Sequence, residues 1–273
     1  MDHLNCFAQN SFLTLYLVIC ICAVGVLISA FEWLSMHKHF AAGGLFSWEI
    51  RRMGTHSTSF EKLAQWLFSY PNVLILFFIQ ITATITIFIS STNHILIGSC
   101  CLIIALSSIL LNFRATEGIS GADKMTRLIM IIGSISFFRS TPLVTSAGLI
   151  FISLQLILAY CTAGWVRLFV PTWRNGTDLA LVLRQHTYSN KFVWSLTKNN
   201  KLLLKFVALF ILFFECSFLI CPLLSSTLFY IYLGCGILFH LSNAFIMGLN
   251  SFVWSFLSTY PALIWLHYYI TLF

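Results

Sequence analysis

Long runs of apolar residues recur along the chain from Ser11 to its last residue, separated by short polar segments. A bilayer core about 30 Å thick needs about 20 apolar residues for each helical crossing, and most of these runs approach that length. The pattern therefore predicts an all-α polytopic membrane protein, a bundle of seven or eight transmembrane helices. The predicted spans are Ser11–Leu34, Asn72–Ser91, His94–Phe113, Lys124–Phe138, Pro142–Leu168, Leu202–Leu223, Thr227–Leu249 and Ser251–Phe273.

Two of these spans depart from a plain apolar helix. The fourth is short and carries Arg127, and the last contains Pro261, which cannot donate a backbone hydrogen bond. Lipid cannot satisfy freed backbone groups, so each is a candidate for a partial or broken crossing packed against neighbouring protein. This is why the predicted number of crossings is seven or eight.

Two further segments have the pattern of helices that lie in the membrane interface. The stretch Thr58–Tyr70 opens with a capping box made by Thr58 and Glu61, and its apolar residues then fall on one side at helical spacing. The stretch Thr177–Gln185 also alternates leucines with polar residues, and Asp178 stands in its first turn, where the helix dipole favours an anion. We expect one or two interfacial amphipathic helices here.

The composition excludes a soluble globular protein. Hydrophobic residues make up 59% of the 273 residues and charged residues only 8%, which leaves too little polar surface for water. No linker or repeat divides the chain, so we expect one domain over residues 1–273. Eight of the nine cysteines lie in apolar runs without the spacing of a zinc site, so no metal is predicted.

The net charge of +7 is unevenly distributed between the two predicted membrane faces. If consecutive spans alternate in direction, 14 of the 15 Lys and Arg residues fall on one face, and only Arg139 falls on the other. Six of the eight tryptophans share the basic face, as in an aromatic belt. This pattern indicates contact with lipid headgroups in a bilayer, and nucleic acid is not an expected partner.

Ionisable residues inside the spans need a specific reason, because each costs about 2.5 to 3.5 kcal/mol in mid-bilayer. Glu215 and His240 are the clearest cases. One interpretation is a neutral Glu215 hydrogen-bonded inside the bundle, with Gly234 and Gly236 allowing span six to approach closely. The other is a polar cavity that opens at the basic face, although Arg167 could instead reach lipid phosphates and Asp123 could simply cap a helix. The candidate cavity residues are Arg167, His240, Asn243, Asp123, Glu215, Glu32 and Trp173.

The segments Tyr160–Leu168 and Trp173–Gly176 resemble the horizontally transferred transmembrane (HTTM) domain family, which includes the membrane part of vitamin K-dependent gamma-carboxylase. Gly43–Trp48, Glu215 and His240–Asn243 agree with the same family. The resemblance implies a single membrane-embedded helical domain that spans most of the chain.

The sequence also departs from the carboxylase at residues that matter for catalysis. Where the family member has a pair of lysines, the second of which acts as the base, this chain has Val166 and Arg167. An arginine does not release its proton at accessible pH, so it cannot act as that base. The loop before span four offers Gly121, Ala122 and Asp123 in place of a histidine. Gamma-carboxylation itself is therefore not expected.

Two functional hypotheses follow from the resemblance. Small stand-alone members look like membrane components that work with a partner in maturing secreted peptides, which implies an accessory protein for peptide maturation, export or immunity. Its partner would be a small membrane-anchored protein or the secreted peptide, and its location a bacterial inner membrane. The alternative is a membrane enzyme with a lipid-like or quinone-like cofactor in the helix bundle. The charge rule places the basic face in the cytoplasm, whereas the carboxylase resemblance places it outside.

Overall fold

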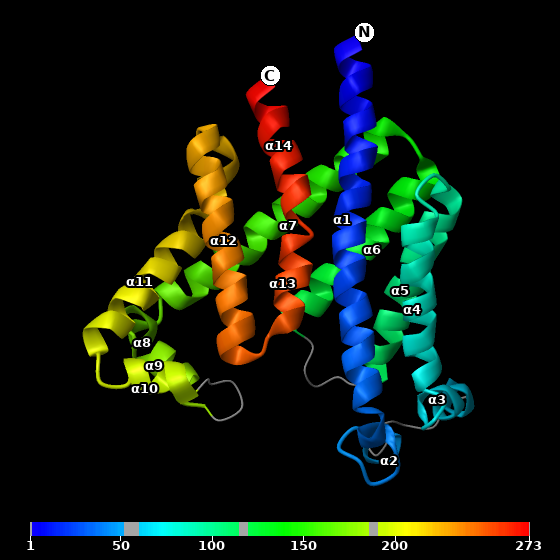
Figure 1. The fold of residues 1–273 in the computed structure, drawn as a ribbon, viewed down its shortest axis with the longest axis horizontal. Helices are drawn as coiled ribbons and strands as arrows, with labels where there is room; N and C mark the ends of the chain where they lie inside the picture. Colours follow the sequence, from blue (N-terminus) through cyan, green and yellow to red (C-terminus); the bar gives the residue numbers. More distant parts are fainter. Residues whose placement is uncertain (1, 52–59, 115–119, 186–190, 273) are drawn as a thin grey trace. The chain divides into compact units, whose positions relative to one another are not determined.

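The computed structural model describes residues 2–51, 60–114, 120–185 and 191–272, and this part of the chain is helical with no strand (Figure 1). Five of its helical segments are long and apolar enough to cross a bilayer. This confirms the all-α class and fits an integral, multi-pass membrane protein. The five are Asn10–Ser35, His94–Arg114, Pro142–Leu168, Lys201–Leu223 and Ser226–Met247.

The chain divides into two compact units, residues 1–148 and 149–273. The division falls inside helix α7 (Pro142–Leu168), whose bounds are those of the predicted fifth span. The expectation of a single domain remains a prediction.

Four long helices form the first unit: α1 (Asp2–Ser35), α4 (Leu74–Ile89), α5 (His94–Arg114) and α6 (Gly121–Arg139). Helix α5 packs against α4 and α6, and α1 packs against α4 and α6 (Figure 1). Gly133 of α6 makes room for α1, since a Cβ there would lie 2.6 Å from the Cδ1 of Ile19. The close approach lets large aliphatic side chains fill the interior of this unit.

Helix α6 begins earlier than predicted, because Ser120 caps it. The Ser120 hydroxyl accepts from the Asp123 amide at 3.1 Å, and the Asp123 carboxylate accepts from the Ser120 amide at 3.0 Å. This reciprocal capping box adds a polar first turn to the short fourth span. Farther along, Arg127 donates to the side-chain oxygen of Asn112 in α5, with that amide oriented toward the guanidinium. The charge that made this span unusual therefore has a partner inside the unit.

The short helices of the first unit are η1, α2 and α3. Helix α3 lies within the predicted interfacial stretch and buries Ala64 and Phe68 while it exposes Leu63 and Trp66. The predicted capping box at Thr58 lies outside the described residues. The bounds of these elements are His37–Phe40 for η1, Trp48–Arg51 for α2 and Phe60–Phe68 for α3.

The second unit contains the rest of α7, a group of short helices and the last three predicted spans. The short helices follow α7, and α9 matches the predicted interfacial stretch, with Asp178 in its first turn. Span six ends in a 3-10 turn, and span seven is a single helix. The bounds are α8 Pro171–Arg174, α9 Thr177–Arg184, α10 Lys191–Thr197, α11 Lys201–Ser217, η3 Phe218–Leu223, α12 Ser226–Met247, α13 Asn250–Leu257 and α14 Tyr260–Leu272.

The last predicted span is broken into α13 and α14. Its break lies just before Pro261, where a residue without an N–H fits the first turn of a new helix. The hydroxyls of Ser258 and Thr259 donate to backbone oxygens at the end of α13, at 2.8 and 2.6 Å. Backbone groups freed by the break are thus partly satisfied by neighbouring side chains, and Tyr260 begins α14 inside the unit.

Candidate functional site

An ion pair links α7 and α11 in the second unit. The Nη1 of Arg167 donates to both carboxylate oxygens of Glu215. The glutamate side chain is 2% exposed and the arginine side chain 31%. The guanidinium also lies over the ring of Trp173, with 5.0 Å between its carbon and the ring centroid. Three predicted site residues are therefore in one place, and Glu215 is paired with a cation.

The ion pair depends on a close approach of two backbones at Gly164. A Cβ at Gly164 would lie 2.7 Å from the Cβ of Glu215 and 2.8 Å from the amide nitrogen of Cys216. The expectation that Gly234 and Gly236 admit span six is wrong. At Gly234 a Cβ would meet no atom within 4 Å, and at Gly236 it would meet the hydroxyl of Tyr260. Glycine does allow span six to approach, but that glycine is on α7.

His240 is part of a separate chain of hydrogen bonds through the interior of the second unit. The Tyr160 hydroxyl lies 2.7 Å from the Nε2 of His240 and 3.1 Å from the Tyr260 hydroxyl. All three side chains are buried, and they come from α12, α7 and α14. The missing side chain at Gly236 leaves the space that the Tyr260 hydroxyl occupies. Hydrogen bonds thus link polar side chains of three helices in an apolar interior.

Aromatic rings enclose this chain. The ring of Tyr160 stacks on Phe218 at a centroid distance of 4.0 Å, and the His240 imidazole stacks on Phe256 at 4.3 Å. The Nδ1 of His240 is buried and has no hydrogen-bond partner among the described residues. Because side chains fill the space around the imidazole, this geometry favours a role in helix packing over contact with a cofactor.

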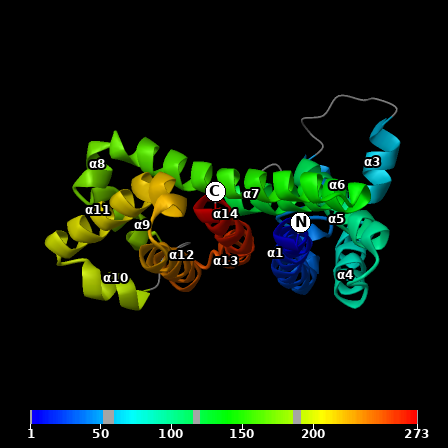
Figure 2. The same cartoon turned by 90° about the horizontal axis from the view of Figure 1, so that it is seen from above.

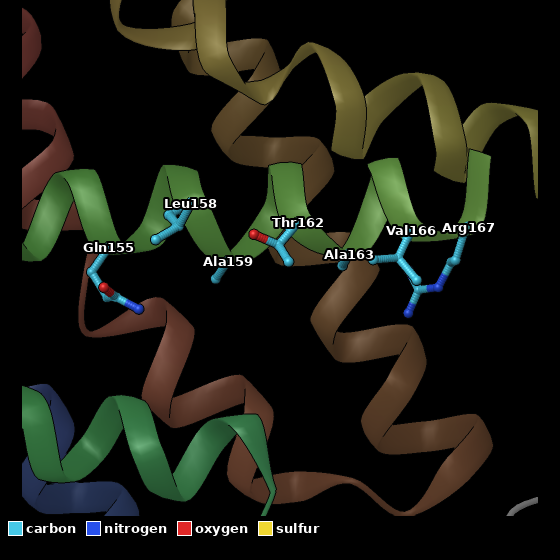
Figure 3. Close-up of a pocket in the computed structure, with 7 residues that line it drawn as sticks. All are labelled: Gln155, Leu158, Ala159, Thr162, Ala163, Val166 and Arg167. Carbon is cyan, nitrogen blue, oxygen red and sulfur yellow. The ribbon is translucent and has the colours of Figure 1, made fainter. Parts of the chain in front are cut away.

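A shallow pocket runs along one face of α7, and Figure 3 shows the side chains that line it. Its volume is about 500 Å³, and every lining residue belongs to α7. Gln155 and Arg167 stand at its two ends, which are about 18 Å apart at 1.5 Å per residue. Small or apolar side chains lie between them. The lining residues are Gln155, Leu158, Ala159, Thr162, Ala163, Val166 and Arg167.

The remaining predicted site residues belong to other elements. Asp123 caps α6 in the first unit, as one of the two interpretations of this residue expected. Glu32 is an exposed residue near the end of α1, also in the first unit. Asn243 is half-buried on α12, one turn after His240. The described contacts thus join Arg167, Glu215 and Trp173 but not the whole predicted set.

Two kinds of residue at this site were not predicted from the sequence. Tyr160 and Tyr260 were not recognised as polar groups, although a tyrosine hydroxyl in an apolar span requires a partner in the same way as His240. Gly164 lies within the segment Tyr160–Leu168, and its contact with α11 was not predicted. A glycine three residues before a charged residue on one helix is a local signal for close contact, but it does not identify the second helix.

Arg114 is the centre of a further polar cluster, in the first unit, that the sequence did not predict. Arg114, at the end of α5, is buried. Its Nε donates to the carbonyl of Phe68 at 3.0 Å and its Nη2 to the carbonyl of Phe46 at 2.5 Å, while its guanidinium lies 4.8 Å from the ring centroid of Phe40. This arginine therefore holds the short helices against the end of a long one.

Comparison of the chain with known protein families, with curated proteins and with solved structures found no match.

Proposed function

We propose that this chain is an integral membrane protein of seven or eight crossings in a bacterial inner membrane, related to the HTTM family. Five helices have the length and composition for a crossing. The remaining predicted spans overlap α4, α6 and the pair α13–α14. Short or broken segments are tolerated at membrane depth where protein surrounds them.

We propose further that the protein acts with a partner in the maturation, export or immunity of a secreted peptide, and that the partner contributes a transmembrane helix. The observation that carries this proposal is the pocket on α7, which is open along its length because a single helix lines it. Ala159 and Ala163 are four residues apart, a spacing at which small side chains let helices approach. The Gln155 amide has no hydrogen-bond partner among the described residues, and a partner helix would supply one.

A second candidate, a lipid-like or quinone-like ligand, is favoured by the charge at one end of the pocket. Only the Nη1 of Arg167 donates a hydrogen bond among the described residues, so the Nε and Nη2 groups remain for a polar head. An apolar tail would lie along Leu158 and Ala159. Arg167 would bind such a ligand but would not act as a base.

Photo-crosslinking from within the pocket tests both candidates. A benzophenone amino acid replaces Thr162, which lines the pocket, in the protein produced at its normal level in its native host. The matched control carries the same probe at Leu154, an exposed position of α7 outside the pocket. We expect a discrete adduct with one small membrane protein from position 162 and only lipid adducts from position 154.

The adducts separate the outcomes. A single lipid-like adduct at position 162, absent at position 154, would show that the pocket binds the lipid-like ligand and not a partner helix. Identical mixtures of bulk lipid from both positions would overturn both candidates, because the pocket would then be ordinary lipid-facing surface.

A further inference from the structure

The segment between spans five and six, together with the first turn of span six, carries most of the net charge of the protein. Residues 169–205 include six basic residues and one acidic residue, a net charge of +5 out of +7 for the whole chain. Five of the six basic side chains are described, and all five are exposed. The carboxylate of Asp178 accepts a hydrogen bond from the Thr172 hydroxyl at 2.6 Å. The five exposed basic residues are Arg174, Arg184, Lys198, Lys201 and Lys205.

The helices that carry these charges form a compact group. Helices α8 and α10 each pack on α9, and all three pack on α11, as Figure 2 shows at one end of α11. Gly176 makes the closest approach: its φ is +82°, and a Cβ there would lie 2.7 Å from the amide nitrogen of Lys205. A side chain at Gly176 would therefore be disfavoured by backbone conformation and by space. Four of the five exposed basic residues lie on these helices, and Lys198 lies in the turn between α10 and α11, next to the start of a predicted span.

Large apolar side chains are exposed among these charges. Phe192 and Leu196 of α10 are 69% and 62% exposed, and Leu181 of α9 is also exposed. A surface that mixes cations with large apolar groups suits the boundary between lipid headgroups and acyl chains, where both kinds of group find partners. An acidic soluble peptide would match the cations but would leave these apolar groups in water.

We propose that α8, α9, α10 and the first turns of α11 form a binding surface for anionic phospholipid headgroups. The surface follows the end of α7 at Leu168 and continues into the start of α11 at Lys201, so it lies at the depth of the headgroups if these helices cross the bilayer. Each basic residue near an anionic membrane surface contributes about a fivefold gain in affinity. Five such residues select anionic over zwitterionic lipid.

Lipid retention on the intact protein tests the proposal. The protein is placed in nanodiscs with equal amounts of phosphatidylglycerol and phosphatidylcholine, and native mass spectrometry counts the lipids that remain bound after release. The test variant is Lys198→Gln/Lys201→Gln/Lys205→Gln, which removes three exposed charges. The matched control, Lys198→Arg/Lys201→Arg/Lys205→Arg, changes the same residues but keeps their charge, and Lys124→Gln removes one exposed charge in the first unit.

The wild-type protein is expected to retain phosphatidylglycerol in preference to phosphatidylcholine. In the triple glutamine variant the ratio of retained phosphatidylglycerol to phosphatidylcholine should fall at least tenfold. Three independent contributions of about fivefold each would multiply to about 100-fold. The triple arginine variant and Lys124→Gln should keep it. Millimolar inorganic phosphate should not displace the lipid; displacement would identify a free phosphate as the ligand.

Three results would overturn the proposal. The first is equal retention of both lipids by the wild-type protein. The second is an unchanged preference in a triple glutamine variant that elutes from size exclusion as the wild type does. The third is displacement of the anionic lipid by an acidic peptide, which would identify a protein partner instead.

Discussion

The contact between α7 and α11 at Gly164 gives a quantitative prediction. Substituting Gly164→Ala would place a Cβ 2.7 Å from the Cβ of Glu215 and 2.8 Å from the amide nitrogen of Cys216. Atoms of this kind normally stay beyond about 3.4 Å, and one of the two opposing atoms is backbone that cannot rotate away. The two helices must therefore separate, which also pulls Arg167 away from Glu215.

The magnitude follows from two opposing effects. Overpacking by one methyl group costs about 1 to 3 kcal/mol, whereas alanine is favoured over glycine inside a helix by up to about 1 kcal/mol. We expect a net loss of about 1 to 2 kcal/mol for Gly164→Ala. The matched control is Gly234→Ala on α12, where the new Cβ meets no atom within 4 Å. The same chemical change should there leave stability unchanged or raise it slightly.

Thermal unfolding in detergent, followed by intrinsic tryptophan fluorescence, measures the difference. A loss of 1 to 2 kcal/mol corresponds to a decrease in Tm of about 2 to 8 °C for Gly164→Ala, with no decrease for Gly234→Ala. Equal transition temperatures for the two variants would refute the reasoning, because they would show that α7 and α11 are not in backbone contact at this position.

Two further predictions concern buried polar groups. Arg114→Lys should lower stability by about 2 to 3 kcal/mol, because an ammonium cannot reproduce the two directed bonds of the guanidinium; the exposed Arg139→Lys serves as control in chemical denaturation and should be neutral. Tyr160→Phe should cost about 1 to 3 kcal/mol by leaving the Nε2 of His240 without its partner. Tyr268→Phe removes an exposed tyrosine hydroxyl bond and should cost less than about 1 kcal/mol. Equal losses at the buried and exposed positions in either pair would contradict the burial described above.

The helices themselves were largely predictable from the sequence. The predicted fifth span coincides with α7, and the proline in the last predicted span marks the place where α13 ends and α14 begins. Both are local properties. An apolar run long enough to cross lipid forms a helix because only a helix satisfies its backbone within the segment, and proline disrupts that pattern wherever it occurs.

The partners of the polar residues were not predictable from the same signals. Glu215 was expected near the glycines of α12 but pairs with Arg167, and Tyr160 joins residues 80 and 100 positions away. Hydropathy does not show which face of a helix meets which neighbouring helix. The residues of a membrane helix that face lipid and those that face other helices are similarly apolar. Only the packed helices decide such pairs.

Arg114 and Arg139 show the same division within one residue type. Both residues flank apolar spans, and the sequence distinguishes them only by the predicted membrane face, basic for Arg114 and opposite for Arg139. In the structure Arg114 is buried and hydrogen-bonded, whereas Arg139 is exposed. The amino-acid sequence by itself determined where helices form and that several of them are long and apolar enough to cross a bilayer, since these properties follow from the chemistry of neighbouring residues. The tertiary structure decided which charges are enclosed, since enclosure depends on segments distant in the chain meeting around one side chain.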